Sequence, residues 1–230
     1  MVQLGSGLEY KVFDQLDGRV LKIRRAIPSR VLRSLVHSLR ARDLARWPRV
    51  VRILLPDTNG VPGLVACLAT MSARSRKLFG NIDIVRGNDY TQDKVVPLRD
   101  YLEGHSFEES VAVAHGYVTL IRSLWSLGIG DPYYNFLWNS GVYADGTVIQ
   151  LDVADLVTNE AVLSGSTQRQ VWLRTGMAGI ADEALRAEFE RIFNEGLTFE
   201  EFKARWPAEP IFPEISHPQL WVRYQGAEGR

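Results

Sequence analysis

The stretch from Ser106 to Gly128 constrains the fold more than any other part of the chain, because its pattern predicts one long helix that is buried along one face. Ser106 and Glu109 have the spacing of a capping box, in which each side chain bonds to the backbone amide of the other. Apolar residues then recur at helical spacing, at Val111, Ala114, Val118, Ile121 and Trp125. A continuous apolar face needs elements packed against it, so we expect this helix to form the centre of a helical C-terminal unit.

The first 25 residues have a different pattern, in which short apolar runs alternate with turn residues. Asp17-Gly18 stands between the apolar runs 10–13 and 20–23. This dipeptide between two such runs is a strong hairpin signal and predicts two antiparallel strands. Three further elements are expected from the sequence that follows. They are a helix that starts at Ser29 and ends before Pro48, a strand over 50–55 and a strand over 63–70.

A polar segment over 81–94 predicts a connection between two lobes, an N-terminal β-rich lobe over 1–94 and a helical C-terminal lobe over 95–230. Within the second lobe, the runs 136–138 and 147–151 flank a turn at Asp145-Gly146 and predict another hairpin. Helices are expected near 183–193 and 198–206. The fold class predicted from this order is α+β.

Composition excludes several classes of protein. With 230 residues, 46% of them hydrophobic and 23% charged, the chain has the composition of a folded globular protein rather than a disordered, collagen-like or coiled-coil one. The single cysteine, Cys67, cannot form an internal disulfide, which fits a reducing compartment. The sequence shows neither a secretory leader nor an apolar stretch long enough to span a membrane. We therefore expect a cytoplasmic protein.

Charge is balanced over the whole chain but not along it. There are 27 basic and 27 acidic residues in total, yet residues 19–52 hold eleven basic residues and one acid, Asp43. A basic stretch of this kind either meets phosphates or an acidic partner, or forms an arginine-rich helix face in solvent. The pattern alone does not choose between these readings.

Several motifs in a fixed order resemble the protein-kinase-like superfamily, beginning with Gly5-Ser6-Gly7 and Val12. Gly5-Ser-Gly-Leu-Glu-Tyr-Lys-Val12 is similar to the glycine-rich loop of these enzymes, with Tyr10 in place of the third glycine. Val20-Leu-Lys22 is similar to the strand whose lysine pairs with nucleotide phosphates. The family holds that lysine with an acid on the next helix, where this chain has Asp43 instead of the usual glutamate.

Two acidic motifs continue the resemblance in the second lobe. Gly130-Asp131 and the following Asn135 are similar to the catalytic loop, although the loop lacks His-Arg and is one residue shorter than the family's spacing. Val148-Ile-Gln-Leu-Asp152 is similar to the strand that ends in a magnesium-binding aspartate, with Val153 where the family has phenylalanine. Gly-Asp is closest to the loop of lipopolysaccharide and aminoglycoside kinases. The resemblance covers residues 4–155 and fades beyond them.

The resemblance implies a two-lobed kinase-like fold with a reduced C-terminal lobe and an atypical, ATP- and Mg²⁺-dependent phosphotransferase. In this reading Gly5, Ser6, Gly7 and Val12 cover the nucleotide, and Lys22, held by Asp43, meets its phosphates. Asn135 and Asp152 would hold Mg²⁺, and Asp131 would act as the catalytic base. The acceptor would be a hydroxyl of a protein, sugar or lipid that is itself acidic or phosphorylated, because the basic stretch would attract it.

Two other functions stay open at this point. The departures at Asp43, at Ile129-Gly130, in the shortened loop and at Val153 are also compatible with a pseudokinase that serves as an interaction or regulatory module. Alternatively, residues 19–52 could bind the phosphate backbone of a nucleic acid, although aromatic residues do not interleave the arginines as a stacking platform requires. Histidine spacing predicts no metal site, and no Gly-x-Ser-x-Gly motif is present for a serine nucleophile.

Overall fold

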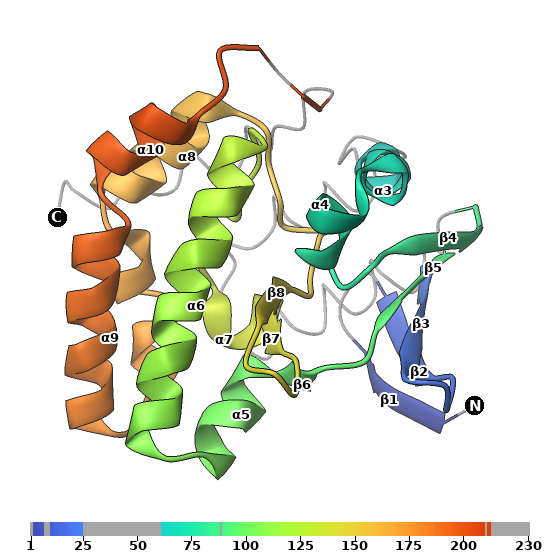
Figure 1. Cartoon of the computed structure of the whole chain (residues 1–230), viewed down its shortest axis with the longest axis horizontal. Coiled ribbons are helices and arrows are strands. Elements are labelled where there is room, and N and C mark those ends of the chain that lie inside the picture. Colours follow the sequence, from blue (N-terminus) through green and yellow to red (C-terminus); the bar gives the residue numbers. More distant parts are fainter. Residues whose placement is uncertain (1, 7–9, 25–60, 88, 210, 213–230) are drawn as a thin grey trace, which may run out of the picture.

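A computed structural model of the chain describes residues 2–6, 10–24, 61–87, 89–209 and 211–212. An antiparallel sheet built mostly from the N-terminal part of the chain lies on one side, and a group of helices lies on the other (Figure 1). A second, smaller sheet stands between them. This is an α+β arrangement, which confirms the predicted class.

The larger sheet has five described strands in the order β1-β2-β3-β5-β4, and all neighbouring pairs are antiparallel. They are β1 (Val2–Ser6), β2 (Tyr10–Asp14), β3 (Arg19–Arg24), β4 (Asp83–Arg86) and β5 (Asp89–Asp93). The predicted hairpin is confirmed, because β2 pairs with β3 and Val12 stands opposite Lys22. Gly18 adopts φ +83° in the turn, where its lack of a side chain removes the steric cost.

The prediction of a connection over 81–94 is wrong, because β4 and β5 occupy most of it. The sequence of these strands is polar, which is why it was interpreted as a loop. Tyr90, Thr91 and Gln92 are buried between the neighbouring strands and the layers below. Asp83, at the start of β4, is neutralised by Arg19 and Arg76, each at 3.0 Å. These ion pairs tie the exposed edge strand β4 to β3 and to the helix that carries Arg76.

The segment 63–70 is a helix and not the predicted strand. α3 (Val61–Thr70) is followed by the short α4 (Ala73–Lys77), and α3 contacts β4. Leu64, Val65 and Leu68 are buried, which is the spacing of one helix face. A short apolar run carries no period that separates a strand from a buried helix, and here packing against the sheet decided for the helix.

The smaller sheet has the order β6-β7-β8 and consists of β6 (Val96–Pro97), β7 (Ser140–Val142) and β8 (Val148–Gln150). A hairpin at this place is confirmed, but its first arm is wrongly predicted. Residues 136–139 form the helical turn α7 (Phe136–Asn139), whose Phe136 ring is buried in the core. The strand therefore begins only at Ser140.

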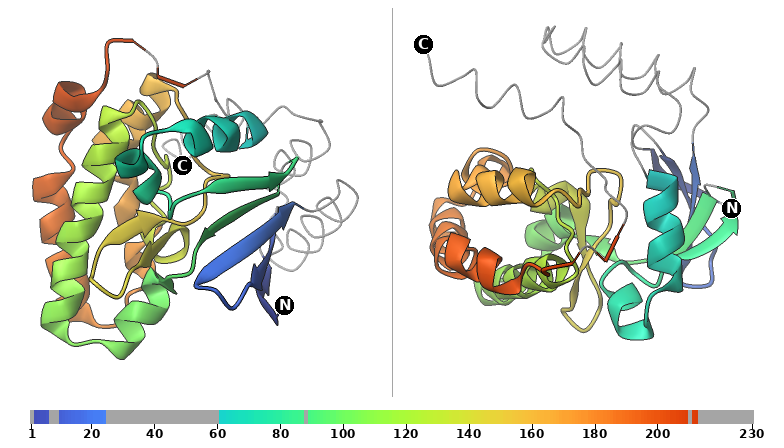
Figure 2. Two further views of the ribbon diagram at one scale, coloured as in Figure 1. Left: turned by 45° about the vertical axis from the view of Figure 1, so that its right-hand side comes forward. Right: turned by 90° about the horizontal axis from the view of Figure 1, so that it is seen from above.

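The helical part is built around α6 (Phe107–Ser126), which confirms the predicted long helix and its capping box. Figure 2 shows α9 and α10 beside it on the face away from the larger sheet. The remaining elements are α5 (Leu98–Gly104), α8 (Glu160–Gln168), the short 3-10 turns η2 (Val171–Leu173) and η3 (Met177–Gly179), α9 (Glu183–Gly196) and α10 (Phe199–Arg205). The last two helices are close to their predicted ranges. None of the helices in the described ranges has the length and apolar character of a membrane span.

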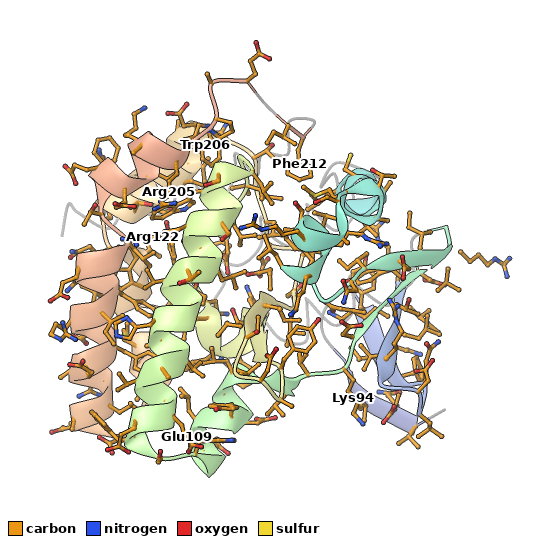
Figure 3. The ribbon with its side chains drawn as sticks, in the orientation of Figure 1. Lys94, Glu109, Arg122, Arg205, Trp206 and Phe212 are labelled. Atoms are coloured by element: carbon orange, nitrogen blue, oxygen red, sulfur yellow. The ribbon has the colours of Figure 1, made fainter. Side chains whose placement is uncertain are left out.

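Polar contacts at the surface fix the helices around α6. In Figure 3, Arg122 on α6 and Arg205 on α10 lie close to one another. Both pair with Glu201, at 3.5 and 2.9 Å respectively, and Arg122 also donates a 2.9 Å hydrogen bond to the carbonyl of Gly196. This carboxylate shared by two guanidinium groups sets α10 across the end of α6.

Direct contacts also join the two sheets. Lys94, labelled in Figure 3 where the chain leaves the larger sheet, pairs with Asp14 at 2.6 Å. Gln92 is fully buried, and its side-chain amide donates to the carbonyls of Phe79 and Gln150 at 2.8 and 3.1 Å. Gln150 lies on β8, so a side chain of the larger sheet bonds directly to the backbone of the smaller one. The predicted domain division at residue 94 falls where the chain passes from β5 to β6 and stays a prediction.

The capping box of α6 allows a direct stability test. Ser106 accepts a 3.3 Å bond from the amide of Glu109, and Glu109 accepts a 2.9 Å bond from the amide of Ser106. Ser106→Ala leaves both ends of this exchange weakened, so we expect a loss of about 1 kcal/mol in the free energy of unfolding. Ser123→Ala, at an exposed hydroxyl inside the same helix, is the control. Equal losses in urea titrations of the two variants would contradict this role of the cap.

Candidate functional site

Lys22 is a buried cation in the middle of the larger sheet. It lies on β3 between Val12 of β2 and Tyr90 of β5, and only 9% of its surface is exposed. Its Nζ donates a 2.6 Å hydrogen bond to the backbone carbonyl of Leu151 and stands 5.6 Å from the centre of the Tyr90 ring. The strand therefore directs this ammonium group toward the end of β8, where Asp152 follows.

Burial lowers the pKa of Lys22 to about 8, and the negative charge of Asp152 opposes this shift. The lowered value means that the sheet interior destabilises the charged ammonium. A backbone carbonyl and a carboxylate at the same strand end compensate only part of this penalty. The site thus holds a cation whose environment favours the arrival of further negative charge.

Asp131 is the second buried ionisable group, with 2% of its surface exposed. Its Oδ1 accepts a 2.8 Å bond from the backbone amide of Tyr133. Its Oδ2 accepts bonds from the side-chain amide of Asn139 at 2.8 Å and from the backbone amide of Asn135 at 3.3 Å. Both oxygens are therefore oriented by fixed donors.

Asn139 joins Asp131 to a further acid, Asp155. The side-chain nitrogen of Asn139 is 2.8 Å from Asp131 and 3.5 Å from Asp155. Burial and, second to it, the neighbouring Asp155 carboxylate together raise the pKa of Asp131 to about 7, against the effect of the three hydrogen bonds. Two carboxylates that meet at one amide resist simultaneous ionisation unless a cation joins them.

Backbone pairing brings the two acidic segments together. Gly130, directly before Asp131, exchanges two hydrogen bonds with Val157, at 3.0 and 2.9 Å. The backbone amides of Leu151 and Asp152 both donate to the carbonyl of Asn139, at 2.7 and 3.3 Å. A short segment, 151–157, therefore runs from Lys22 past Asp152 and Asp155 to the Asp131 loop. A side chain at position 130 would press on Leu163, since an added Cβ would lie 3.1 Å from its Cδ2.

The structure brings together several of the residues predicted from the sequence. Lys22 and Asp152 lie at one strand end, and Asp131 lies at the other end of the same short segment. Asn135 contributes its backbone amide to Asp131 and begins α7. Its predicted metal-binding role stays a prediction, and the side chain that contacts both acids is Asn139.

Other predicted residues lie on β1 and β2 or outside the described residues. Gly5 and Ser6 belong to β1, where Gly5 pairs with Val12 and Ser6 with Lys11. Gly7 and Asp43 fall outside the described residues, as do the predicted helix from Ser29 and the strand over 50–55. Of the basic stretch over 19–52, the structure describes residues 19–24, in which Arg19 is paired with Asp83.

Asn139 and Asp155 were missed because the loop is longer than the family's pattern. The helical turn α7 follows Asp131 and ends at Asn139, so the asparagine that meets the aspartate stands eight residues after it in the chain. The available signal was the position of Asn139 directly before the apolar hairpin. For Asp155 it was the repeated acid in Asp152-Val-Ala-Asp155.

The donor set fits a magnesium ion bound together with phosphates. Within the described ranges, no three His, Cys, Asp or Glu side chains gather that could hold a metal by themselves. Mg²⁺ sites of enzymes that bind nucleotides commonly use one or two carboxylates, and substrate phosphates and water complete the shell. Asp152, Asp155 and the amide oxygen of Asn139 are hard oxygen donors of that kind. Asp131 adds a further carboxylate at the same asparagine.

Comparison with known proteins adds no relative to this description. A scan against protein-family models gives no match, and a search of curated proteins finds no similar sequence. The function has to be inferred from the residues and contacts of this chain.

Proposed function

We propose that the protein is an ATP- and Mg²⁺-dependent phosphotransferase with a two-lobed, kinase-like fold. One observation carries this proposal. The segment 151–157 connects a lysine whose charge is disfavoured by burial to a cluster of two acids and an asparagine, in which the pKa of Asp131 is raised by burial and by Asp155. A ligand that combines phosphates with a divalent cation would satisfy both ends of this segment.

Each residue then has a distinct task. Lys22 would meet the phosphates next to the transferred one, and Asp152, Asp155 and Asn139 would hold the magnesium ion. When bound, the ion would neutralise charge on the phosphate oxygens. Asp131 would accept a hydrogen bond from the acceptor hydroxyl and orient it for attack. Its pKa of about 7 suits a group that takes a proton near neutral pH.

The order of elements also supports the proposal. An antiparallel sheet that carries the lysine is followed by a helical part, and a hairpin ending in an acid lies between them. The acceptor remains a hydroxyl of a protein, sugar or lipid. The basic stretch predicted to attract it lies mainly outside the described residues.

Two measurements test the function directly. Thermal denaturation should shift upward with ATP and Mg²⁺ together and much less with either alone, because the two ends of the site are filled by one complex. Incubation with γ-labelled ATP should then release labelled phosphate or transfer it to the protein or an added acceptor. If saturating ATP and Mg²⁺ produce no thermal shift, the proposal is wrong.

Asn139 and Asn135 provide a matched pair of variants. Asn139→Ala removes the amide that touches both acids, so we expect phosphoryl transfer to fall about 100-fold or more and to need higher Mg²⁺. Asn135→Ala keeps the backbone amide that Asp131 uses and should change the rate less than about threefold. Steady-state rates over a Mg²⁺ titration compare them. A larger loss for Asn135→Ala would restore the metal role predicted from the sequence.

One feature favours a pseudokinase as the second candidate. Both oxygens of Asp131 already accept hydrogen bonds from the protein, and its side chain is almost completely buried. A base sequestered in this way would bind nucleotide without transferring its phosphate. A thermal shift with ATP and Mg²⁺ but no transfer to water, protein or acceptor would identify this case.

A further inference from the structure

The loop that carries Asp131 contains a backbone conformation that side chains rarely adopt. Tyr134 has φ +48°, in the left-handed region, and its side chain is completely buried. A bulky residue in this region is strained and persists only where the surroundings impose it. Glycine would adopt the same conformation without this cost, so a buried tyrosine here needs a separate explanation.

Three contacts hold the loop in this conformation. The hydroxyl of Tyr134 is 2.5 Å from Oγ1 of Thr167, which donates its own proton to the carbonyl of Leu163 at 2.9 Å. The Tyr134 hydroxyl is therefore the donor of the shorter bond. Its ring packs edge-on against Trp172 at 5.2 Å between centres. One residue earlier, Thr175 donates a 2.6 Å bond to the carbonyl of Tyr133.

The left-handed residue sets the direction of the peptide that follows it, whose amide, at Asn135, reaches Oδ2 of Asp131 at 3.3 Å. Earlier in the same turn, the amide of Tyr133 reaches Oδ1 at 2.8 Å. The amide of Tyr134 itself closes the turn onto the carbonyl of Asp131 at 3.3 Å. The turn that contains Tyr134 thus supplies one backbone amide to each oxygen of the same carboxylate.

We propose that Tyr134 is a positioning residue, which uses its buried hydroxyl bond to Thr167 to hold the turn that orients the carboxylate of Asp131. α8, which carries Thr167, thereby becomes part of the support of the site, although it contributes no group to the acid cluster itself. A glycine at position 134 would permit the turn without enforcing it. The link to catalysis rests on the proposed function, whereas the link to the orientation of Asp131 does not.

Tyr134→Phe and Thr167→Val remove the same hydrogen bond from its two sides and keep the shapes of the side chains. We expect hydrogen exchange of the Tyr133 and Asn135 amides to become about tenfold faster in each variant, with exchange in the middle of α6 unchanged. The double variant should be no worse than Thr167→Val alone, because that variant already removes the bond that Tyr134→Phe removes, together with the bond to the Leu163 carbonyl. Tyr143→Phe is the control, since it removes the hydrogen bond of another, partly buried tyrosine hydroxyl, to Asp93, outside this loop.

Phosphoryl transfer gives a second readout. In Tyr134→Phe and Thr167→Val, kcat should fall about tenfold while KM for ATP stays within about twofold, because the carboxylate is misplaced and the nucleotide contacts remain. Tyr134→Gly should lower kcat by at least as much, although it relieves the strained φ. Exchange at Tyr133 and Asn135 within twofold of wild type in both conservative variants would overturn the proposal. Faster exchange in a protein that neither binds ATP nor transfers phosphate would instead reject the proposed function alone.

Discussion

Asp131→Asn is expected to abolish most phosphoryl transfer and, at pH 8, to make the ligand-free protein more stable. The loss of rate should be about 10²- to 10⁴-fold, the range for a removed general base. The stability gain has a separate cause. The variant removes a carboxylate that is buried beside Asp155. The asparagine amide oxygen can still accept the bonds that Oδ2 accepts, whereas the bond from the Tyr133 amide to Oδ1 is lost.

The raised pKa of Asp131 determines how the stability difference between wild type and Asp131→Asn changes with pH. The pKa of Asp131 is raised from 3.8 to about 7 in the folded protein, so its favourable contribution is complete below pH 3.8 and is lost as the pH rises through 7. This loss is on the order of 4 kcal/mol at pH 8. Free energies of unfolding in urea at pH 4 and pH 8 should therefore diverge between wild type and variant as the pH rises.

A matched control separates burial from charge. Asp145→Asn removes an exposed carboxylate on the turn between β7 and β8, and it should change neither the transfer rate nor the pH dependence of stability appreciably. A constant difference between wild type and Asp131→Asn across this pH range would show that Asp131 is not strained by burial. Transfer that persists within threefold of wild type would remove Asp131 from the catalytic set.

Lys22→Met is expected to weaken binding of ATP with Mg²⁺ by about 30-fold or more, because it removes the buried cation that would face the phosphates. The ligand-free protein should not lose stability in proportion. At pH 7 the lowered pKa, about 8 instead of 10.5, corresponds to a penalty on the order of 3 kcal/mol for the buried charge. The variant relieves this penalty and loses the bond to the Leu151 carbonyl, so the two effects largely offset each other.

Lys77→Met is the corresponding control at the surface. Lys77 is about half exposed, lies 4.0 Å from Asp145 and shares no contact with the acid cluster in the described ranges. Isothermal titration with ATP and Mg²⁺ and urea unfolding should be measured on both variants. Binding weakened equally in both would show that Lys22 acts only through overall charge, and a loss above about 4 kcal/mol in Lys22→Met would show that its burial is stabilising.

The parts of the fold that could be predicted were those with a strong local signal. The capping box and apolar face of α6 identify the helix without reference to its neighbours, and Asp17-Gly18 identifies the β2–β3 hairpin in the same way. β5 could not be identified, because its buried Thr91 and Gln92 look like loop residues in the sequence. The side-chain amide of Gln92 donates to a partner far away in the chain, the carbonyl of Gln150.

The candidate site shows the same limit. Lys22 and Asp152 could be proposed from their positions on apolar strands, and the structure places them at one strand end. The places of Asn139 and Asp155 in the site are set by the path of a loop that contains a helical turn and by the pairing of Gly130 with Val157. No local sequence pattern signals either feature. The spacing of the family's shorter catalytic loop therefore pointed to Asn135.

The acceptor that fixes the Lys22 ammonium is a main-chain oxygen, and this has a consequence for how the sequence can change. A carbonyl is present whatever amino acid occupies position 151, so mutation there cannot delete the anchor, whereas mutation of the lysine can. Under selection for the proposed transfer activity, position 151 should accept many apolar side chains while position 22 accepts almost none. A deep mutational scan under selection for this activity should show many tolerated substitutions at position 151 and almost none at position 22.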